Sequence, residues 1–376
     1  MAIAGLGGYT HQLIEGLAVT HMSDQVNWGL YISNFIFMGG VSAASLVLVV
    51  AAFLYRQPEA AQSVTLGLGI AIAAAVMCGL FITVDLGRPD RLWHIVPFLG
   101  ELSFPYSMLA WDAVVLNTYI PFTLGLAIYI LFLKYNNREP ATRGALFVLG
   151  NAAILFAISM LTVEAFLLSG HVARPLWNTA VLVPRFVVAA FAASSAIIIL
   201  VLRLLDRFTE RKEKSAEIGI LVGVLKVAVL INLFLIAVEF FTHFYHPTDH
   251  SASAIYLYFG LDGRTMLVPW TWTSLAFGVI AVIILFNPRL RGRRAWLNLA
   301  CVLTVMEIWI EKSMGLLIPG FIPTPLGEIF EYLPSPIEIL VSLGVLAIGM
   351  LIFTLIAKIA IHIELGHTRY SAPDSN

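Results

Sequence analysis

Residues 28–55, WGLYISNFIFMGGVSAASLVLVVAAFLY, contain no Asp, Glu, Lys or Arg. A helix needs about 20 apolar residues to cross the hydrocarbon core of a bilayer, so this stretch is long enough for one span. Its apolar residues run continuously, without the alternation that is typical of a membrane β-strand. The stretch therefore predicts a transmembrane helix, and it sets the fold class that we expect for the chain.

Eight further stretches have the same character. Only 12% of the 376 residues are charged and the mean hydropathy is +0.89, whereas an ordinary soluble domain has about 25% charged residues. We expect an all-α polytopic transmembrane protein of about nine to ten spans, depending on whether a segment within residues 9–22 also crosses. The nine predicted spans are residues 28–55, 62–84, 106–133, 144–168, 179–202, 218–244, 265–285, 295–316 and 337–361.

Composition argues against several classes of protein. The two cysteines, Cys78 and Cys301, lie inside apolar runs, a pattern that predicts no metal site, iron–sulfur site or disulfide in this chain. The net charge of −1 and the lack of a basic tract argue against a nucleic-acid partner. None of the nine histidines lies near the centre of a predicted span, which argues against a membrane haem. We therefore expect any redox centre to be organic or to lie on another chain.

The distribution of basic residues predicts the topology. Of the 22 Lys and Arg residues, 15 follow the odd-numbered spans, and cytoplasmic loops carry such an excess. We expect the N-terminus outside and the C-terminus inside the cytoplasmic membrane of a bacterium. The longest loops, residues 85–105, 245–267 and 317–335, then lie on the periplasmic side. Partner proteins are expected to dock there.

Ten ionisable residues fall within or at the ends of the predicted spans, although each costs about 2.5–3.5 kcal/mol to insert. All but Lys226 lie in the predicted outer half. A single one could snorkel to the interface or bond a neighbouring helix, but the group predicts a polar pocket open to the outer leaflet. These residues are Asp85, Asp112, Glu164, Arg185, Lys226, Glu239, His243, Glu307, Glu311 and Lys312.

Several short segments carry a family resemblance. Residues 28–34 (WGLYISN), 85–93 (DLGRPDRLW) and 173–178 (ARPLWN) resemble the polysulfide-reductase-type NrfD family of membrane subunits. Residues 309–312 (WIEK) and 319–323 (PGFIP), with Tyr332 and Glu338, are similar to its larger HmcC/DsrP/QrcD-like branch. The resemblance covers most of the chain, and its motifs occur in order between the corresponding spans.

The resemblance implies a single integral membrane domain over residues 1–376. A first four-helix bundle is expected at 28–168, a second at 179–316, and an additional span at 337–361. The resemblance also implies a site for menaquinone or ubiquinone near the outer face, with no haem or metal in this chain. A four-cluster iron–sulfur subunit is the implied partner, and the larger branch adds a multihaem cytochrome c and other membrane subunits.

These patterns lead to one main hypothesis and two alternatives. The main hypothesis is a quinone-reactive subunit of a respiratory redox complex, which is not catalytic alone and which could also translocate protons. The alternatives are an inert anchor for redox partners and a secondary transporter that uses the same charges. The resemblance assigns Asn34, Asp85 and Arg88 to the quinone, and Glu164 replaces a tyrosine of smaller relatives. The candidate proton-transfer residues are Asp85, Asp112, Glu164, Glu239 and His243, and the candidate quinone-binding residues are Asn34, Asp85, Arg88 and Arg185.

Overall fold

The computed structural model describes residues 1–54, 64–96, 99–136, 143–210, 215–324 and 326–365. Within these ranges the chain is helical and forms no strand beyond one isolated bridge between Leu261 and Arg264. The α-helices are α1 Ala2–Glu15, α2 Leu30–Leu54, α3 Val64–Asp85, α4 Met108–Tyr135, α5 Arg143–Ser169, α6 Leu182–Phe208, α7 Ser215–Tyr245, α8 Ala252–Phe259, α9 Val268–Phe286, α10 Pro288–Arg291, α11 Arg294–Lys312 and α12 Pro336–Glu364.

Each of the nine predicted spans corresponds to one long helix, so the expected polytopic all-α membrane protein is confirmed. Seven helices, namely α3, α4, α5, α6, α7, α9 and α12, are long and apolar enough over their described residues to cross a membrane. The described apolar part of α2 is shorter, Leu30–Leu46, and α11 carries four charged residues. Two predicted span ends, Tyr55 and Gln62, lie outside the described residues.

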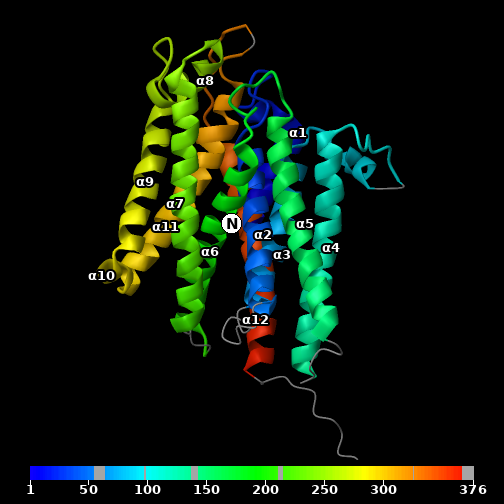
Figure 1. The fold of residues 1–376 in the computed structure, drawn as a ribbon. Coiled ribbons are helices and arrows are strands. Elements are labelled where there is room, and N and C mark those ends of the chain that lie inside the picture. Colours follow the sequence, from blue (N-terminus) through cyan, green and yellow to red (C-terminus); the bar gives the residue numbers. More distant parts are fainter. Residues whose placement is uncertain (55–63, 97–98, 137–142, 211–214, 325, 366–376) are drawn as a thin grey trace, which may run out of the picture.

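The long helices pack in two groups of four (Figure 1). In one, α2 packs on α3 and α5, and α4 packs on both α3 and α5. In the other, α6 packs on α7 and α11, and α9 packs on both α7 and α11. Helix α2 also packs on α6 and joins the groups, while α12 packs on α3 outside both rings. The assignment of residues 1–376 to a single domain stays a prediction.

The two ends of the helix bundle differ in their connections. The upper end in Figure 1, which we call the loop-rich end, carries the short helices η3 Pro89–Ile95 and α8, together with the connection from α11 to α12. The opposite end carries α10, with Arg289 and Arg291, and the last turn of α6, with Arg207, and we call it the basic end. The location in a bacterial inner membrane and the end that faces outward stay predictions.

Helix α1 does not add a tenth span. With 14 residues it is about 21 Å long, shorter than the roughly 30 Å hydrocarbon core. It crosses α12 where Gly5 lies directly against Gly344, so a side chain on either glycine would collide with the other helix. Near its other end, Gln12 donates a hydrogen bond of 2.7 Å to the carbonyl of Val84, at the loop-rich end of α3.

Helix α12 begins at a capping box that the sequence encodes locally. The hydroxyl of Ser335 accepts from the backbone N–H of Glu338, and the Glu338 carboxylate accepts from the backbone N–H of Ser335. Pro336 occupies the first helical position, where its missing N–H has no cost. The additional helix therefore starts at a defined point of the loop-rich end.

Candidate functional site

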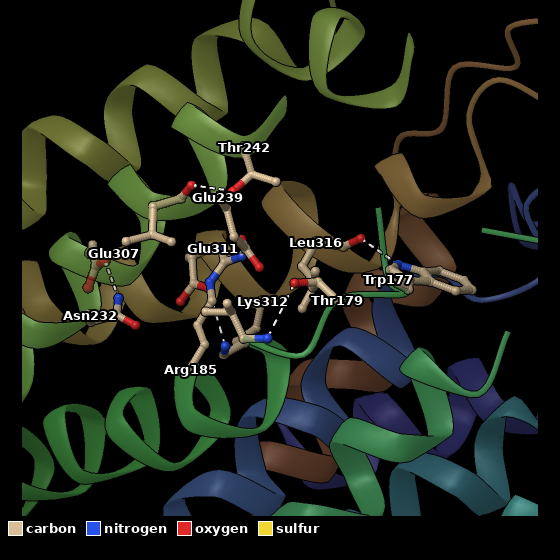
Figure 2. A network of polar contacts seen from close by, with 12 residues as sticks. Trp177, Thr179, Arg185, Asn232, Glu239, Thr242, Glu307, Glu311, Lys312 and Leu316 are labelled. Atoms are coloured by element: carbon tan, nitrogen blue, oxygen red, sulfur yellow. Dashed lines mark hydrogen bonds and ion pairs between the residues drawn. The ribbon is translucent and has the colours of Figure 1, made fainter. Parts of the chain in front are cut away.

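The most highly charged buried group lies between α6, α7 and α11 (Figure 2). Arg185 forms ion pairs with Glu239 of α7 and with Glu311 of α11, the latter at 2.6 Å between Nε and Oε1. Lys312 Nζ lies 3.2 Å from Glu311 Oε1. We call these four residues the charge cluster. Its two cations and two carboxylates balance each other, which lowers the cost of burying them.

Helix ends bring the charge cluster together at the loop-rich end of the second bundle. Arg185 lies in the first turn of α6, Glu239 near the end of α7, and Glu311 at the end of α11. A π-helical turn, Ser313–Leu317, follows α11 directly, and such turns are frequent at functional sites. Lys312 stands at this change of helix type, with Nζ 4.3 Å from the centre of the Phe186 ring.

A third carboxylate extends the charge cluster along α11. Glu307, one turn before Glu311, is fully buried and accepts a 3.0 Å hydrogen bond from Asn232 Nδ2 of α7. Ser274 of α9 donates to the backbone carbonyl of Glu307 at 3.0 Å. His243 is half-buried one turn beyond Glu239 and lies within electrostatic range of it. The charged face of α7 thus leads from the bundle interior towards the loop-rich surface.

The cavity beside the charge cluster is small. It measures about 20 Å³ and is lined by Arg185, Glu311, Tyr258 and Ser274 among others. That volume holds about one water molecule, so it suits a proton carrier and does not hold a quinone ring. Polar donors suited to a quinone carbonyl are present nearby, but the ring itself would have to lie outside this cavity.

Asn34 lies at the junction of the two bundles. Its side-chain oxygen accepts a 2.9 Å hydrogen bond from Trp309 Nε1 of α11, which joins α2 to the helix that carries Glu311. No described residue accepts a hydrogen bond from the Asn34 amide nitrogen. The amide therefore keeps a donor for another acceptor, in the orientation that Trp309 imposes.

Two predicted carboxylates come together in the first bundle. Asp112 of α4 is 3% exposed and Glu164 of α5 is fully buried. The two are electrostatic neighbours, and Lys312 is also within range of Glu164. Neither carboxylate oxygen of Glu164 accepts a hydrogen bond from the described chain. Glu164 packs against Gly39 of α2 so closely that a Cβ there would overlap its carboxylate.

Asp85 lies in a separate polar group where α1, α2, α3 and α12 meet. Its electrostatic neighbours are Tyr31 and Glu338. Tyr31 donates a hydrogen bond to Gln12 Oε1 at 2.6 Å. Tyr332 donates to Glu338 Oε1 at 2.6 Å, and burial together with this carboxylate raises the pKa of Tyr332. The first bond ties α2 to α1, and the second ties the last loop to the start of α12.

Arg88 lies apart from all these groups. Its guanidinium pairs with Asp90 at 3.0 Å, and the two side chains are 68% and 60% exposed. The hydrogen bond from Arg88 lowers the pKa of the Asp90 carboxyl. Arg88 therefore lies on the surface in this structure, and its assignment to the quinone stays a prediction.

The structure thus joins Arg185 with Glu239 and Asp112 with Glu164, and it separates both pairs from Asp85. The pattern of intramembrane charges had already marked Glu311 and Lys312, although not as site residues. Trp309 was missed as a site residue although it lies in the quoted WIEK segment, because no pattern indicates its contact with Asn34 across 275 positions. In the described part of the chain no three or more His, Cys, Asp or Glu residues are grouped to hold a metal ion.

The helical bundles and the ionisable residues buried between them define a polytopic integral membrane protein. The chain belongs to the polysulphide reductase, NrfD family, whose family model matches residues 18–323. The match ends before α12, in agreement with the position of this helix outside both rings.

Relatives in other organisms match almost the full chain. A putative dimethyl sulfoxide reductase membrane subunit of Halobacterium salinarum is 27% identical over 94% of this chain and 87% of its own length. An Hdr-like menaquinol oxidoreductase integral membrane subunit of Archaeoglobus fulgidus is 25% identical over 95% and 90%. A selenate reductase subunit of Mesobacillus selenatarsenatis is 23% identical over 96% and 91%.

Proposed function

We propose that this chain is the quinone-reactive membrane subunit of a multi-subunit oxidoreductase. It exchanges electrons between the membrane pool of menaquinone or ubiquinone and a four-cluster iron–sulfur subunit. Membership of the NrfD family supports this proposal, as do relatives named as subunits of reductases and of a menaquinol oxidoreductase. The observation that carries it is the charge cluster, in which Arg185 lies between Glu239 and Glu311 within the membrane.

The chemistry of a quinol explains why buried ionisable residues matter. Oxidation of a quinol to a quinone releases two electrons and two protons. The electrons pass to the partner's cluster, whereas the protons need acceptors inside the bilayer. Glu239 suits this role because its Oε1 is buried and accepts no hydrogen bond from a described residue. His243, one turn nearer the surface, then carries the proton to the loop-rich end.

Other residues position the quinone, fix the buried carboxylates in place or accept protons. The Asn34 amide, oriented by Trp309, donates a hydrogen bond to a quinone carbonyl. Arg185 keeps Glu239 and Glu311 in place by its two ion pairs. Asp112 and Glu164 form a second proton-accepting pair in the first bundle, and Lys312 lies within electrostatic range of Glu164. Asp85 and Arg88 stay in the proposal as residues near the loop-rich surface.

The proposal includes an orientation and partners. We place the chain in the cytoplasmic membrane of a bacterium, with the N-terminus outside and the loop-rich end at the periplasmic surface. The excess of Lys and Arg at the basic end supports this orientation. The iron–sulfur subunit, a multihaem cytochrome c and further membrane subunits then dock on the loop-rich end.

The test is quinol-linked turnover of the purified, assembled complex carrying Glu239→Gln or Asp85→Asn. Loss of a positioned proton acceptor lowers rates by about 10²–10⁴-fold, and we expect Glu239→Gln to fall in this range. Thr242→Val is the matched control, because Thr242 lies on the same helix, is exposed and bonds only its own helix backbone. Unchanged turnover in both acidic-residue variants, with the complex intact, would remove them from the mechanism.

One observation favours the alternative of an inert anchor, because the cavity beside the charge cluster holds only about one water. Photo-cross-linking with a quinone analogue that carries a photoreactive group distinguishes a quinone-reactive subunit from an inert anchor. Cross-linking to α2 or α11 of this chain within the intact complex supports the quinone-reactive subunit. Cross-linking only to another subunit supports the anchor.

A further inference from the structure

A long groove lies between α6 and α12, away from the charge cluster. It has a volume of about 800 Å³, within the range of binding sites for small molecules. Its floor is formed by α2 and α3, through residues such as Val41, Ala73 and Ala74. Its walls are α6, with Val201, and α12, with Phe353.

The lining of the groove changes along its length. From Met38 and Gly349, near the middle of α2 and α12, most lining residues are aliphatic or aromatic. Apart from Thr354, the polar and charged lining residues gather where α6 and α12 reach the basic end, and they are Thr209, Glu210, Lys358 and His362. An occupant that fits both regions has a long apolar part and one polar end.

One cation lines the groove at the basic end, and a second lies beside a lining residue of the opposite wall. Lys358 of α12 is exposed and lines the groove. Arg207 of α6 places its guanidinium 5.8 Å from the ring centre of Phe208, another lining residue. Neither cation forms an ion pair with a residue that the structure describes. Glu210, the acidic residue at the same mouth, already has an interaction within the chain.

We propose that this groove binds one anionic phospholipid, with its acyl chains between α6 and α12 and its phosphate between Arg207 and Lys358. Charge complementarity selects this occupant, since basic groups next to membrane helices attract anionic head groups by about 1 kcal/mol each. A neutral quinone head group would gain little from two cations. The lipid would bridge α6 to α12, which pack on α2 and α3 on either side of the groove.

The test measures lipid binding and does not depend on quinone turnover. The full chain, purified in its complex, is titrated with phosphatidylglycerol or phosphatidylcholine in detergent, and bound lipid is counted by native mass spectrometry. We expect one tightly held phosphatidylglycerol and no comparable phosphatidylcholine. Arg207→Gln and Lys358→Gln should each weaken phosphatidylglycerol binding by roughly fivefold.

Two further variants separate the groove from the general charge of the surface. Arg289→Gln with Arg293→Gln removes two exposed cations from the same end but outside the groove, and binding should be unchanged. Thr354→Trp narrows the groove without changing charge and should also weaken binding. The proposal would be overturned if the complex bound phosphatidylglycerol and phosphatidylcholine with equal affinity, or if the control variant lost as much lipid affinity as the groove variants. It would also be overturned if a quinone or a partner helix were recovered in the groove.

Discussion

At the scale of single residues, burial decides which ion pairs contribute to the stability of the fold. Arg185 is 5% exposed and is held by two carboxylates, whereas Arg88 and Asp90 form their pair in contact with solvent. Removing one partner from a buried group leaves an uncompensated charge in a medium of low dielectric constant. An exposed pair that loses a partner is solvated by water instead.

Arg185→Gln should therefore lower the free energy of unfolding by about 3–5 kcal/mol, because Glu239 and Glu311 lose their shared cation. The measurement is the thermal unfolding midpoint of the purified complex. Arg88→Gln serves as the control, and its midpoint should match that of the wild type. A midpoint for Arg185→Gln equal to that of the control would show that the charge cluster does not stabilise the bundle.

Gly39 provides a second test at this scale, because its missing side chain makes room for the Glu164 carboxylate. Gly39→Ala should cost about 1–3 kcal/mol, the usual cost of overpacking. The neighbouring Gly40→Ala should be tolerated, since its nearest atom would be Ala190 Cβ at 3.4 Å. In the double variant Gly39→Ala with Glu164→Ala, part of the lost stability should return, and no recovery would contradict the contact.

The composition of the candidate site could be predicted from the sequence, but its pairing could not. Charges inside apolar spans stand out because each is costly to insert, and this pattern found both Arg185 and Glu239. It could not tell that Arg185 pairs with Glu311, whereas Asp85 lies with Tyr31 and Glu338. Pairing depends on which helices pack together, and hydropathy carries no information on that.

At the scale of elements, the long helices were predictable and the short ones were not. Nine spans follow from the length of apolar runs, because the bilayer thickness imposes one length on all of them. Helix α1 has no such constraint, and its position depends on the contact of Gly5 with Gly344. The long loop predicted at residues 85–105 contains a 3₁₀-helix over Pro89–Ile95.

Gly5→Val should displace α1 from α12, since the added side chain would collide with the backbone of Gly344. Accessibility of a cysteine at position 12 measures the displacement, because Gln12 is 3% exposed when α1 is in place. In Gln12→Cys alone we expect slow maleimide labelling, and with Gly5→Val fast labelling. Gly7→Val, combined with Gln12→Cys, is the control, because nothing lies within 4 Å of the Cβ position of Gly7. Fast labelling of the cysteine at position 12 in this control would show that valine destabilises α1 itself, whether or not it collides with α12.

At the scale of the whole molecule, α2 is the centre of the structure. It packs on α3 and α5 in its own bundle and on α6 and α11 in the other. The family resemblance implies two four-helix bundles with an additional span, and that division of the chain stays a prediction. The groove between α6 and α12 was not predictable, because it exists only where helices distant in sequence diverge.

The orientation of the molecule can be tested with single cysteines, because the native Cys78 and Cys301 are both fully buried. Ser103→Cys at the loop-rich end and Ala295→Cys at the basic end are both exposed positions. With the loop-rich end in the periplasm, a membrane-impermeant maleimide should label Ser103→Cys in intact cells. It should label Ala295→Cys only after permeabilisation, and the reverse pattern would invert the proposed topology.

The central position of α2 also has a consequence for synthesis of the chain. Ribosomes add about 5–20 residues per second, so α11 enters the membrane roughly 10–50 s after α2. During that interval Asn34 has no Trp309 to bond it, and Ser42 has no Tyr119 until α4 is inserted. The nascent α2 must therefore keep its polar face shielded by the insertion machinery or by water. Of these two partners, Trp309 is the last to reach α2.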